Sequence, residues 1–213
     1  MGVTTYTFEK NDRSFRHICT GLAALFSVSA MTTAQKFGYA QKVYPGASAL
    51  LYGKLTTDLI LSHNLYDLVQ PVAENKWPDS LVFFEKNKVK AQDDLSSPDP
   101  LTLTETGEMG ITWSLMGQAY LAFFEDIRHD LIQKLGRDSN LWSYETLKFG
   151  YQIRNAVAHS GRIHFNRPDN SPVSWKGLYY SHANNGKVIF EDIGVVALIV
   201  LMFEIESVLK TMS

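Results

Sequence analysis

The chain has 213 residues, of which 45% are hydrophobic, enough to bury one sizeable core, whereas two domains would each be small. Its formal net charge of -2 excludes a protein that binds polyanions through overall charge, so any nucleic-acid contact requires a local basic patch. The single cysteine, Cys19, excludes an internal disulfide and a zinc site built from several thiolates. We therefore expect one domain over residues 1–213 in a reducing cytoplasm, with Cys19 buried as a small hydrophobic residue.

Two apolar runs, residues 18–30 and 195–203, resemble a targeting signal and a membrane span only superficially. Glu9 and Asp12 precede the first run, and the region before it is long for the start of a signal peptide. The second run has nine residues, far short of the roughly 20 needed to cross a bilayer. We interpret both runs as buried helices and expect no membrane association.

The first part of the chain predicts two helices after an extended start. Residues 1–11 look extended or loose, and Asn11 or Asp12 can cap a helix over residues 13–37. After a Pro-Gly turn, leucines at mostly helical spacing predict a second helix over residues 47–69, antiparallel to the first. These leucines are Leu51, Leu55, Leu59, Leu65 and Leu68.

Residues 71–112 interrupt the helical pattern. They contain four prolines and several acidic and serine residues, which are typical of irregular structure. Loops of this length inside compact domains are usually functional or mobile. We expect an excursion anchored on the bundle by residues 81–84, with residues 96–100 exposed.

Two further helices are predicted next. Thr112 is a candidate cap for the third helix and Gly136 follows its end, while Asp138 or Ser139 can cap a fourth helix that Gly161 ends. The expected apolar stripe of the third helix is Met116, Tyr120, Phe123, Ile127, Leu131 and Leu135.

The last part of the chain predicts a small hairpin and a final helix. Residues 173–180 and 187–190 are strand candidates, and the Asn-Gly pair at 185–186 favours a tight turn between them. Asp192 is a candidate cap for a helix whose centre, residues 195–203, is apolar on every side and must be covered by its own bundle or by a second subunit. The expected fold is a mainly α-helical bundle of about five helices with a β-hairpin inserted before the last one.

The end of the fourth helix concentrates three polar side chains that suit RNA. Arg154, Asn155 and His159 lie in its last turns, with Asn155 and His159 on one face and Arg154 beside them. The residues between them, 156–158, are small and apolar, so another backbone can approach closely.

These residue types fit metal-independent RNA cleavage. The 2′-hydroxyl next to the scissile phosphate is a built-in nucleophile, and its attack needs a base, an acid and positive charge near the phosphate. Imidazoles have an ordinary pKa near 6.5, so His159 suits the proton transfers. Arg154 suits the phosphate because its planar guanidinium can hold two oxygens, and Asn155 can orient the substrate or His159.

The stretch resembles the signature of the HEPN superfamily, in which an Arg, usually followed by a polar residue, precedes a His by four to six residues. Here Arg154 and Asn155 are followed after three residues by His159, at the end of a helix and before a further apolar helix. The resemblance covers residues 113–211 moderately well, and residues 1–112 only in their expected helical character. It implies a HEPN-like helical domain and a metal-independent endoribonuclease with Arg154, Asn155 and His159 as catalytic residues.

The resemblance also implies partners and a setting. One protomer of this chain offers one such His, and in the family the site forms across a homodimer, which brings two His and two Arg together. RNA is the implied substrate, a toxin or defence role is the implied setting, and an antitoxin or regulatory protein is an implied partner. In HEPN toxins controlled by nucleotidyltransferase-type antitoxins a Tyr stands two residues after the His, whereas this chain has Gly161 there, so control through that Tyr is not expected. No cofactor and no metal are expected.

Four other residues have weaker claims on RNA. Arg162, His164 and Arg167 follow the motif and form either a local phosphate-binding patch or an ordinary solvated loop. Lys176 stands among aromatic residues that could stack bases, although strand packing explains those aromatics as well.

Two alternatives to catalysis remain open at this point. The chain can be a catalytically inactive HEPN-like module that binds RNA or a protein partner, or a structural helical oligomer. Arg154 can pair with an acidic neighbour, and His159 can interact with the end of the helix dipole. Glu125 and Asp126 can orient Arg154 or hold a metal, but adjacent acids on a helix are usually solvated.

Overall fold

The computed structural model describes residues 4–37, 48–51, 58–64, 78–86, 108–135, 143–166 and 171–212. The elements in chain order are β1 (Thr5–Glu9), α1 (Arg13–Phe37), β2 (Ser48–Leu51), β3 (Asp58–Asn64), β4 (Ser80–Lys86), α3 (Glu108–Leu135), α4 (Glu145–Ala158), β5 (Val173–Trp175), β6 (Leu178–Tyr180) and α5 (Val195–Thr211). Short 3-10 helices occupy His182–Asn184 and Ile189–Glu191. The expected mainly helical fold with a small hairpin before the last helix is confirmed, and the first helix has the predicted bounds.

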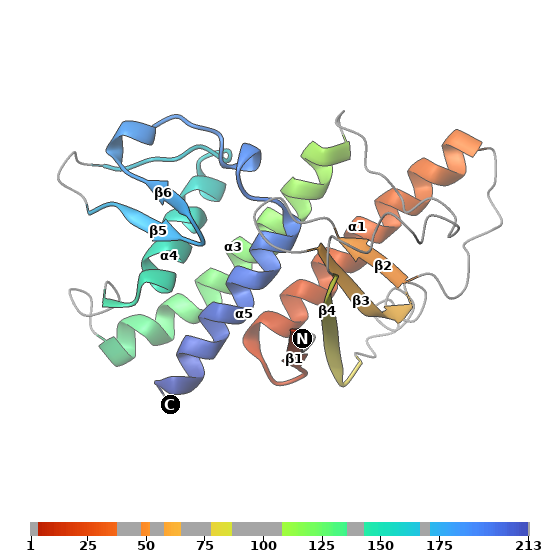
Figure 1. The fold of residues 1–213 in the computed structure, drawn as a ribbon, viewed down its shortest axis with the longest axis horizontal. Coiled ribbons are helices and arrows are strands. Elements are labelled where there is room, and N and C mark those ends of the chain that lie inside the picture. Colours follow the sequence, from red (N-terminus) through yellow and green to blue (C-terminus); the bar gives the residue numbers. More distant parts are fainter. Residues whose placement is uncertain are drawn as a thin grey trace.

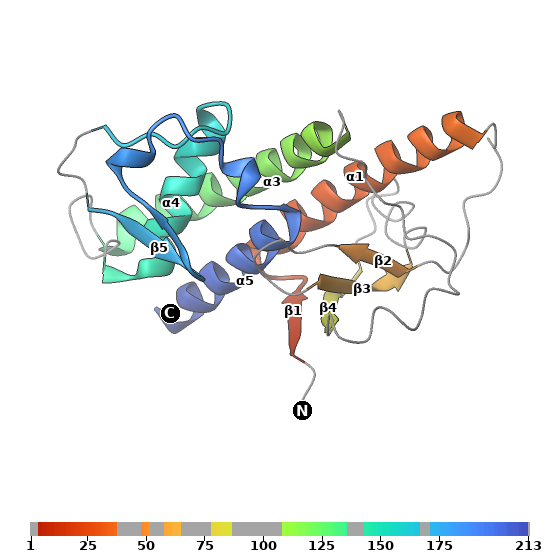
Figure 2. The same cartoon turned by 45° about the horizontal axis from the view of Figure 1, so that its top comes forward.

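Helices α1, α3 and α5 lie alongside one another, and α4 packs on α3 and α5 at one end of the molecule (Figures 1 and 2). The contact between α3 and α4 includes a hydrogen bond of 2.8 Å from the buried Tyr120 hydroxyl to the Gly150 carbonyl oxygen. The predicted apolar stripe of α3 is buried at Met116, Tyr120, Phe123, Ile127 and Leu131. This packing fixes α4, and with it the motif, against the rest of the bundle.

Helix α5 is covered by this chain itself. Its residues from Val196 to Met202 are all buried, and Phe203 packs edge-on against Tyr6 and Phe8 of β1. The apolar character on every side of this helix is therefore satisfied within one chain. It gives no support for a second subunit.

The prediction of a second helix over residues 47–69 is wrong. Strands β2 and β3 occupy residues 48–51 and 58–64, and they join a four-stranded antiparallel sheet of order β1-β4-β3-β2. Within this sheet Leu59 and Leu61, two residues apart, are both fully buried. Leu61 pairs with Phe83 in β4, far along the sequence. The spacing of the leucines fits the period of a helix or that of a strand. The pairing of β3 with β4 makes the segment a strand.

The described parts of the expected excursion over residues 71–112 contain regular structure. Strand β4 lies inside it and buries Leu81 and Phe83, so the expected anchor at residues 81–84 is confirmed. Helix α3 begins at Glu108, before the predicted cap at Thr112. Residues 96–100, which were expected to be exposed, lie outside the described residues.

The hairpin before α5 turns at a different place from the one predicted. Its strands are β5 and β6, joined by Lys176 and Gly177, whose φ angles of 45° and 83° are both positive, as the tightest hairpin turns require. At the Asn-Gly pair only Gly186 has a positive φ, since Asn185 has φ -54° and ψ 131°. That geometry matches the type II turn, which does not suit a two-residue hairpin. The side chain of Asn185 instead binds the backbone of Phe165 through both its oxygen and its nitrogen, at 2.7 and 3.1 Å.

Asp192 does not cap the last helix as predicted. Its carboxylate accepts a hydrogen bond of 2.8 Å from the Tyr180 hydroxyl and pairs with the Lys187 ammonium at 2.6 Å. The burial of Tyr180 and the neighbouring carboxylate raise the pKa of its phenol well above its usual range. Helix α5 begins at Val195 with Gly194 as its cap. Asp192 thus ties the hairpin to the segment before α5.

The first helix is capped by a distant side chain. Asp12 precedes it, but its carboxylate accepts from the Glu9 backbone N–H at 2.9 Å. The first N–H groups of α1, those of Arg13 and Ser14, donate to the buried carboxylate of Glu206 in α5 at 3.4 and 3.2 Å. A carboxylate at a helix N-terminus satisfies free donors and interacts favourably with the dipole.

Replacing Glu206 with alanine is expected to lower the free energy of unfolding by about 1–3 kcal/mol, because buried N–H donors lose their acceptor. Denaturant titration followed by circular dichroism measures the change. The matched control is Ser207→Ala, the next residue on α5, which is exposed and is expected to change stability by less than about 0.5 kcal/mol. Equal stability of the two variants would contradict the capping role.

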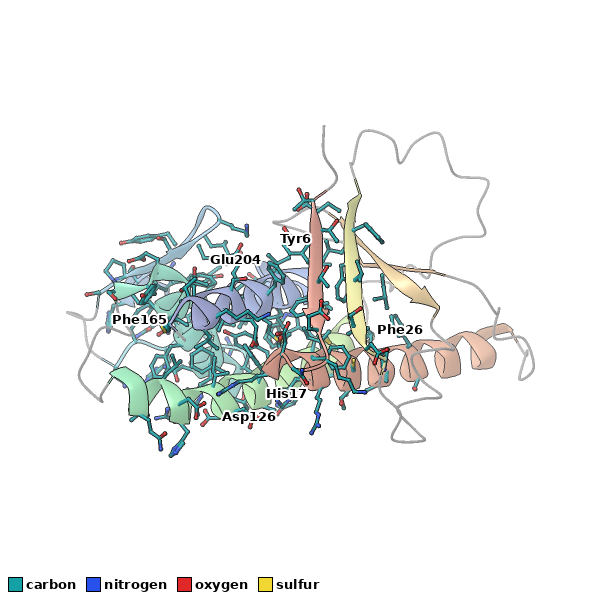
Figure 3. The ribbon with its side chains drawn as sticks, turned by 90° about the horizontal axis from the view of Figure 1, so that it is seen from below. Tyr6, His17, Phe26, Asp126, Phe165 and Glu204 are labelled. Carbon is teal, nitrogen blue, oxygen red and sulfur yellow. The ribbon has the colours of Figure 1, made fainter. Side chains whose placement is uncertain are left out.

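Polar contacts also link α1 with α3. His17 and Asp126 point toward each other between the two helices, with 2.6 Å between Nε2 and Oδ2, and Arg13 pairs with Asp130 (Figure 3). Asp126 is therefore engaged with α1 and not with the motif. Cys19 on α1 is buried as expected, and this burial raises the pKa of its thiol to about 12. No helix in the described part of the chain combines the length and apolar character needed to cross a membrane.

Candidate active site

Helix α4 positions the motif by burying one face and leaving its last turns accessible. It begins at Glu145, later than the predicted start near Ser139, because the residues immediately before it form a short turn and a bend. The acidic Glu145 in the first turn suits the helix dipole. Its buried residues are Leu147, Phe149, Gly150, Gln152, Ile153, Ala156 and Val157.

The helix ends in a tight turn of two left-handed residues. His159 is the C-cap residue of α4, and its backbone N–H donates to the carbonyl oxygens of Asn155 and Ala156 at 3.0 and 3.1 Å. Ser160 and Gly161 follow with φ angles of 58° and 75°, and the Gly161 N–H reaches the Ala156 carbonyl oxygen at 2.7 Å. Gly161 was predicted to end the helix; in the structure Ser160 takes the first left-handed position after His159 and Gly161 takes the next. The turn redirects the chain while the His159 side chain stays exposed.

Arg154 and Asn155 are held together on the side of α4 that faces α3. The Arg154 guanidinium pairs with the Glu125 carboxylate, and its Nη1 donates to Asn155 Oδ1 at 3.0 Å. Glu125 also contacts the guanidinium of Arg128 at 3.4 Å. The side chain of Arg154 is 21% exposed and that of Glu125 41%, so the pair is partly open to solvent. Glu125 thus orients Arg154, one of the two roles considered for it.

The turn also brings a second histidine to the motif. His164 follows His159 by five residues, and the centroids of the two imidazole rings lie 5.3 Å apart with 49° between the ring planes. Both side chains are exposed. Residue spacing gave His164 only a weak claim on a phosphate. The left-handed turn at Ser160 and Gly161 folds the loop back toward His159, and spacing alone does not reveal this turn.

The other residues predicted to contact RNA do not all lie at the motif. Arg162 lies in the same loop, and its Nη1 donates to the Gly186 carbonyl oxygen at 2.9 Å, which anchors its guanidinium on the segment before α5. Arg167 lies outside the described residues. Lys176, in the hairpin turn, pairs with Glu204 of α5 at 2.9 Å.

The hairpin that carries Lys176 packs on the first half of α4. The ring of Phe149 stacks on those of Trp175 and Tyr180 with centroids 5.4 and 5.8 Å apart. Phe149 precedes His159 by ten residues, or about 15 Å along a helix. Lys176 therefore does not join the motif, and Trp175 and Tyr180 are buried by strand packing.

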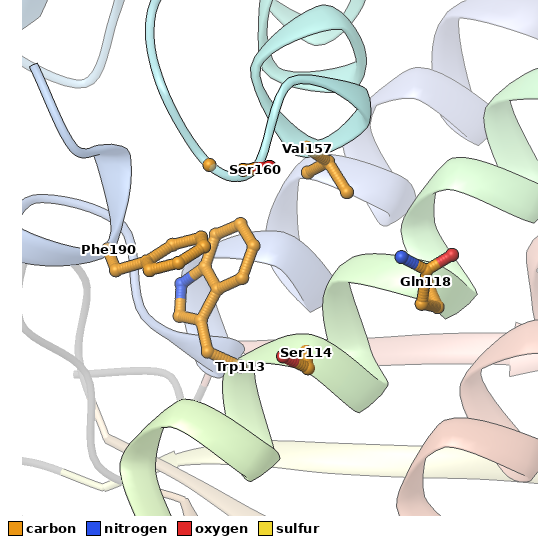
Figure 4. Close-up of a pocket in the computed structure, with 7 residues that line it drawn as sticks. Trp113, Ser114, Gln118, Val157, Ser160 and Phe190 are labelled. Carbon is orange, nitrogen blue, oxygen red and sulfur yellow. The ribbon is translucent and has the colours of Figure 1, made fainter. Parts of the chain in front are cut away.

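A pocket of about 310 Å³ adjoins the turn and was not predicted. In Figure 4 Trp113 and Phe190 lie below Ser160, and Val157 and Gln118 face them from α4 and α3. Trp113 is fixed by a hydrogen bond of 2.6 Å from its indole N–H to the Ile193 carbonyl oxygen. No sequence signal marked this pocket, because its residues come from three separate segments. The lining residues are Trp113, Ser114, Gln118, Val157, Ser160, Gly161 and Phe190.

The described residues contain no cluster of three or more His, Cys, Asp or Glu side chains placed to hold a metal ion. The motif and the loop after it bring together two imidazoles, a guanidinium and an amide, and the pocket beside the turn is lined by other residues. No family model matches the chain, and neither the curated proteins nor the solved structures compared with it provide a match.

Proposed function

We propose that the protein is a metal-independent endoribonuclease of HEPN type, with Arg154, Asn155 and His159 as its catalytic residues. The observation that carries this proposal is the placement of the motif at an open helix end. His159 is exposed, Arg154 and Asn155 are half-buried, and a pocket of about 310 Å³ lies beside the turn that follows. Residues serving only the core would be enclosed, as the apolar face of α4 is.

Each side chain supplies one requirement of the reaction. An imidazole can accept or donate a proton through its ring nitrogens, so that of the exposed His159 can act as a base on the 2′-hydroxyl or as an acid on the leaving 5′-oxygen. The Arg154 guanidinium, directed by Glu125, stabilises the negative charge that develops on the phosphate oxygens. Asn155 accepts a hydrogen bond of 3.0 Å from Arg154, which fixes the guanidinium relative to the end of α4.

The partners and setting belong to the same proposal. RNA is the substrate, and a second copy of this chain is the proposed partner, as in the family that the motif resembles. An antitoxin or regulatory protein and a toxin or defence role rest on that resemblance alone. The burial of α5 within one chain removes the separate argument for a dimer from its apolar surface.

One observation favours a catalytically inactive module that binds RNA or a protein instead. The ion pair between Arg154 and Glu125 occupies the guanidinium that a phosphate would need. The pair is partly exposed, and exposed ion pairs contribute little stability, so a phosphate can compete for Arg154. If a phosphate displaces Glu125 from Arg154, the arginine can serve catalysis. If it does not, the pair between Arg154 and Glu125 is only a structural contact.

The test is cleavage of a mixed-sequence single-stranded RNA in EDTA by the wild type and by Arg154→Ala. We expect the variant to lose about 10²–10³ in rate, because a group that stabilises transition-state charge is removed. The matched control is Arg128→Ala, which removes the other guanidinium that contacts Glu125 and should change the rate only a few-fold. If the folded wild type is inert but binds RNA, the module is the function. Equal loss in both variants would contradict the role given to Arg154.

A further inference from the structure

The loop after α4 presents His164 by a specific arrangement of its neighbours. Ile163 and Phe165 on either side are buried, at 1% and 4% exposure, while His164 between them is exposed. The Ile163 N–H donates to the Lys187 carbonyl oxygen at 2.9 Å, and the Phe165 N–H donates to Asn185 Oδ1 at 2.7 Å. The alternation places the imidazole of His164 outward with its backbone fixed on both sides.

A buried side chain of α4 fixes the same loop. Gln152, only 7% exposed, donates from Nε2 to the carbonyl oxygen of His164 at 2.9 Å. Gln152 lies two residues before Arg154, so the helix that carries the motif also holds the loop in place. Hydrogen bonds to the backbone at and around His164 therefore hold its ring beside the ring of His159.

This distance suits two groups that act on one phosphate. In an in-line displacement the attacking 2′-oxygen and the leaving 5′-oxygen lie on opposite sides of the phosphorus. A base and an acid must each reach their own oxygen at about 2.6–3.2 Å, so their rings stand several ångströms apart. Ring centroids 5.3 Å apart and tilted by 49° fit this requirement.

We propose that His159 and His164 of one chain are the two proton-transfer groups of the ribonuclease. One neutral imidazole takes the proton of the 2′-hydroxyl as the 2′-oxygen forms its bond to phosphorus. The other, as imidazolium, gives a proton to the 5′-oxygen as the bond from phosphorus to that oxygen breaks. The products are a 2′,3′-cyclic phosphate and a free 5′-hydroxyl. This inference rests on the proposed function, but it draws the second proton-transfer group from His164 of the same chain, whereas the family resemblance implies the His159 of a second copy in that role.

The test compares His159→Ala and His164→Ala on ordinary RNA and on RNA with sulfur in place of the scissile 5′-oxygen. A thiol has an ordinary pKa near 8.5, far below that of an alcohol, so the sulfur leaves without a proton from an acid. On ordinary RNA each variant is expected to lose about 10² or more in kcat. On the sulfur substrate, the variant that lacks the acid should return to within about 10-fold of the wild type, while the one that lacks the base keeps its loss.

Several results would overturn the inference. One is an unchanged kcat for His164→Ala, or a change in its KM alone, as expected for a phosphate-binding role. Another is a sulfur substrate that restores the cleavage rate of both variants or of neither. His129→Ala, which removes an exposed histidine of α3, controls for the loss of a surface imidazole and should keep the wild-type kcat. An inert wild type would be a failure of the proposed function, whereas an active wild type with an unaffected His164→Ala variant is a failure of this inference alone.

A mixing experiment tests whether the pair lies within one chain. His159→Ala and His164→Ala are coexpressed with different tags, and species that carry both tags are isolated. If both imidazoles come from the same chain, no site in such a species is complete and it stays as inactive as either variant. Recovery of activity would place the working pair across two chains and overturn the assignment.

Discussion

Replacing His159 with alanine is expected to lower the rate of RNA cleavage by about 10²–10⁴-fold, because the reaction loses one of its proton-transfer groups. The side chain is exposed, and the helix end is closed by the backbone of residue 159, which alanine retains. We therefore expect the variant to fold as the wild type does. Single-turnover cleavage in EDTA measures the loss directly, because product release does not contribute.

The matched control for this prediction is His129→Ala. His129 is also an exposed helical histidine, and it contacts only the Gln133 side chain of α3 at 2.8 Å among the hydrogen bonds described. It should cleave at the wild-type rate. A variant at His159 that keeps full activity would remove the motif from the mechanism, and equal losses at both positions would indicate a general effect of losing a surface imidazole.

Replacing Gly161 with alanine is expected to lower the free energy of unfolding by about 2–5 kcal/mol. The φ angle of 75° puts a side chain in the left-handed region, at about 1–2 kcal/mol. A Cβ added there would also lie 2.1 Å from Cζ of Phe190, an overlap that forces the ring or the turn to move, at about 1–3 kcal/mol. Thermal and denaturant unfolding measure the sum.

The control for Gly161 is Gly177→Ala in the hairpin turn. Its φ angle of 83° is similar, but an added Cβ would meet nothing within 4 Å. The difference between the two variants therefore isolates the contact with Phe190. Equal destabilisation would show that backbone strain alone explains the loss and that the packing of Phe190 on the turn adds nothing.

Features that depend on local pattern could be predicted from the sequence. The first helix has its predicted bounds of residues 13–37, although Glu206 and not the predicted Asp12 accepts from its first N–H groups. The buried stripe of α3 follows from its helical period. The end of α4 with Arg154 and His159 was likewise placed correctly, because a glycine and a loss of apolar spacing mark it.

Features that depend on distant contacts could not be predicted. Residues 58–64 become a strand because β4 pairs with them, and a single stretch of leucines does not reveal its partner. The same limit applies to Glu206, which caps α1 across nearly the whole chain, and to the choice of Glu125 as the partner of Arg154. Each is a matter of which segments meet, not of local propensity.

The candidate site shows both situations side by side. Arg154, Asn155 and His159 could be chosen from their spacing on one helix. The approach of His164 depends on the left-handed φ of Ser160, a residue type with no strong preference for that conformation. The pocket at Trp113 and Phe190 depends on three segments meeting, so it becomes visible only in the folded chain.

The most direct test of a metal-independent ribonuclease is the chemistry of its products. A DNA strand with a single ribonucleotide is incubated with the protein in EDTA, and the ends of the fragments are identified by mass spectrometry. We predict one cut, on the 3′ side of the ribonucleotide, leaving a 2′,3′-cyclic phosphate and a 5′-hydroxyl, and no cut in the all-deoxy strand. Cleavage that leaves a 5′-phosphate, or that ignores the ribonucleotide, would contradict attack by the 2′-hydroxyl and with it the roles of Arg154 and His159.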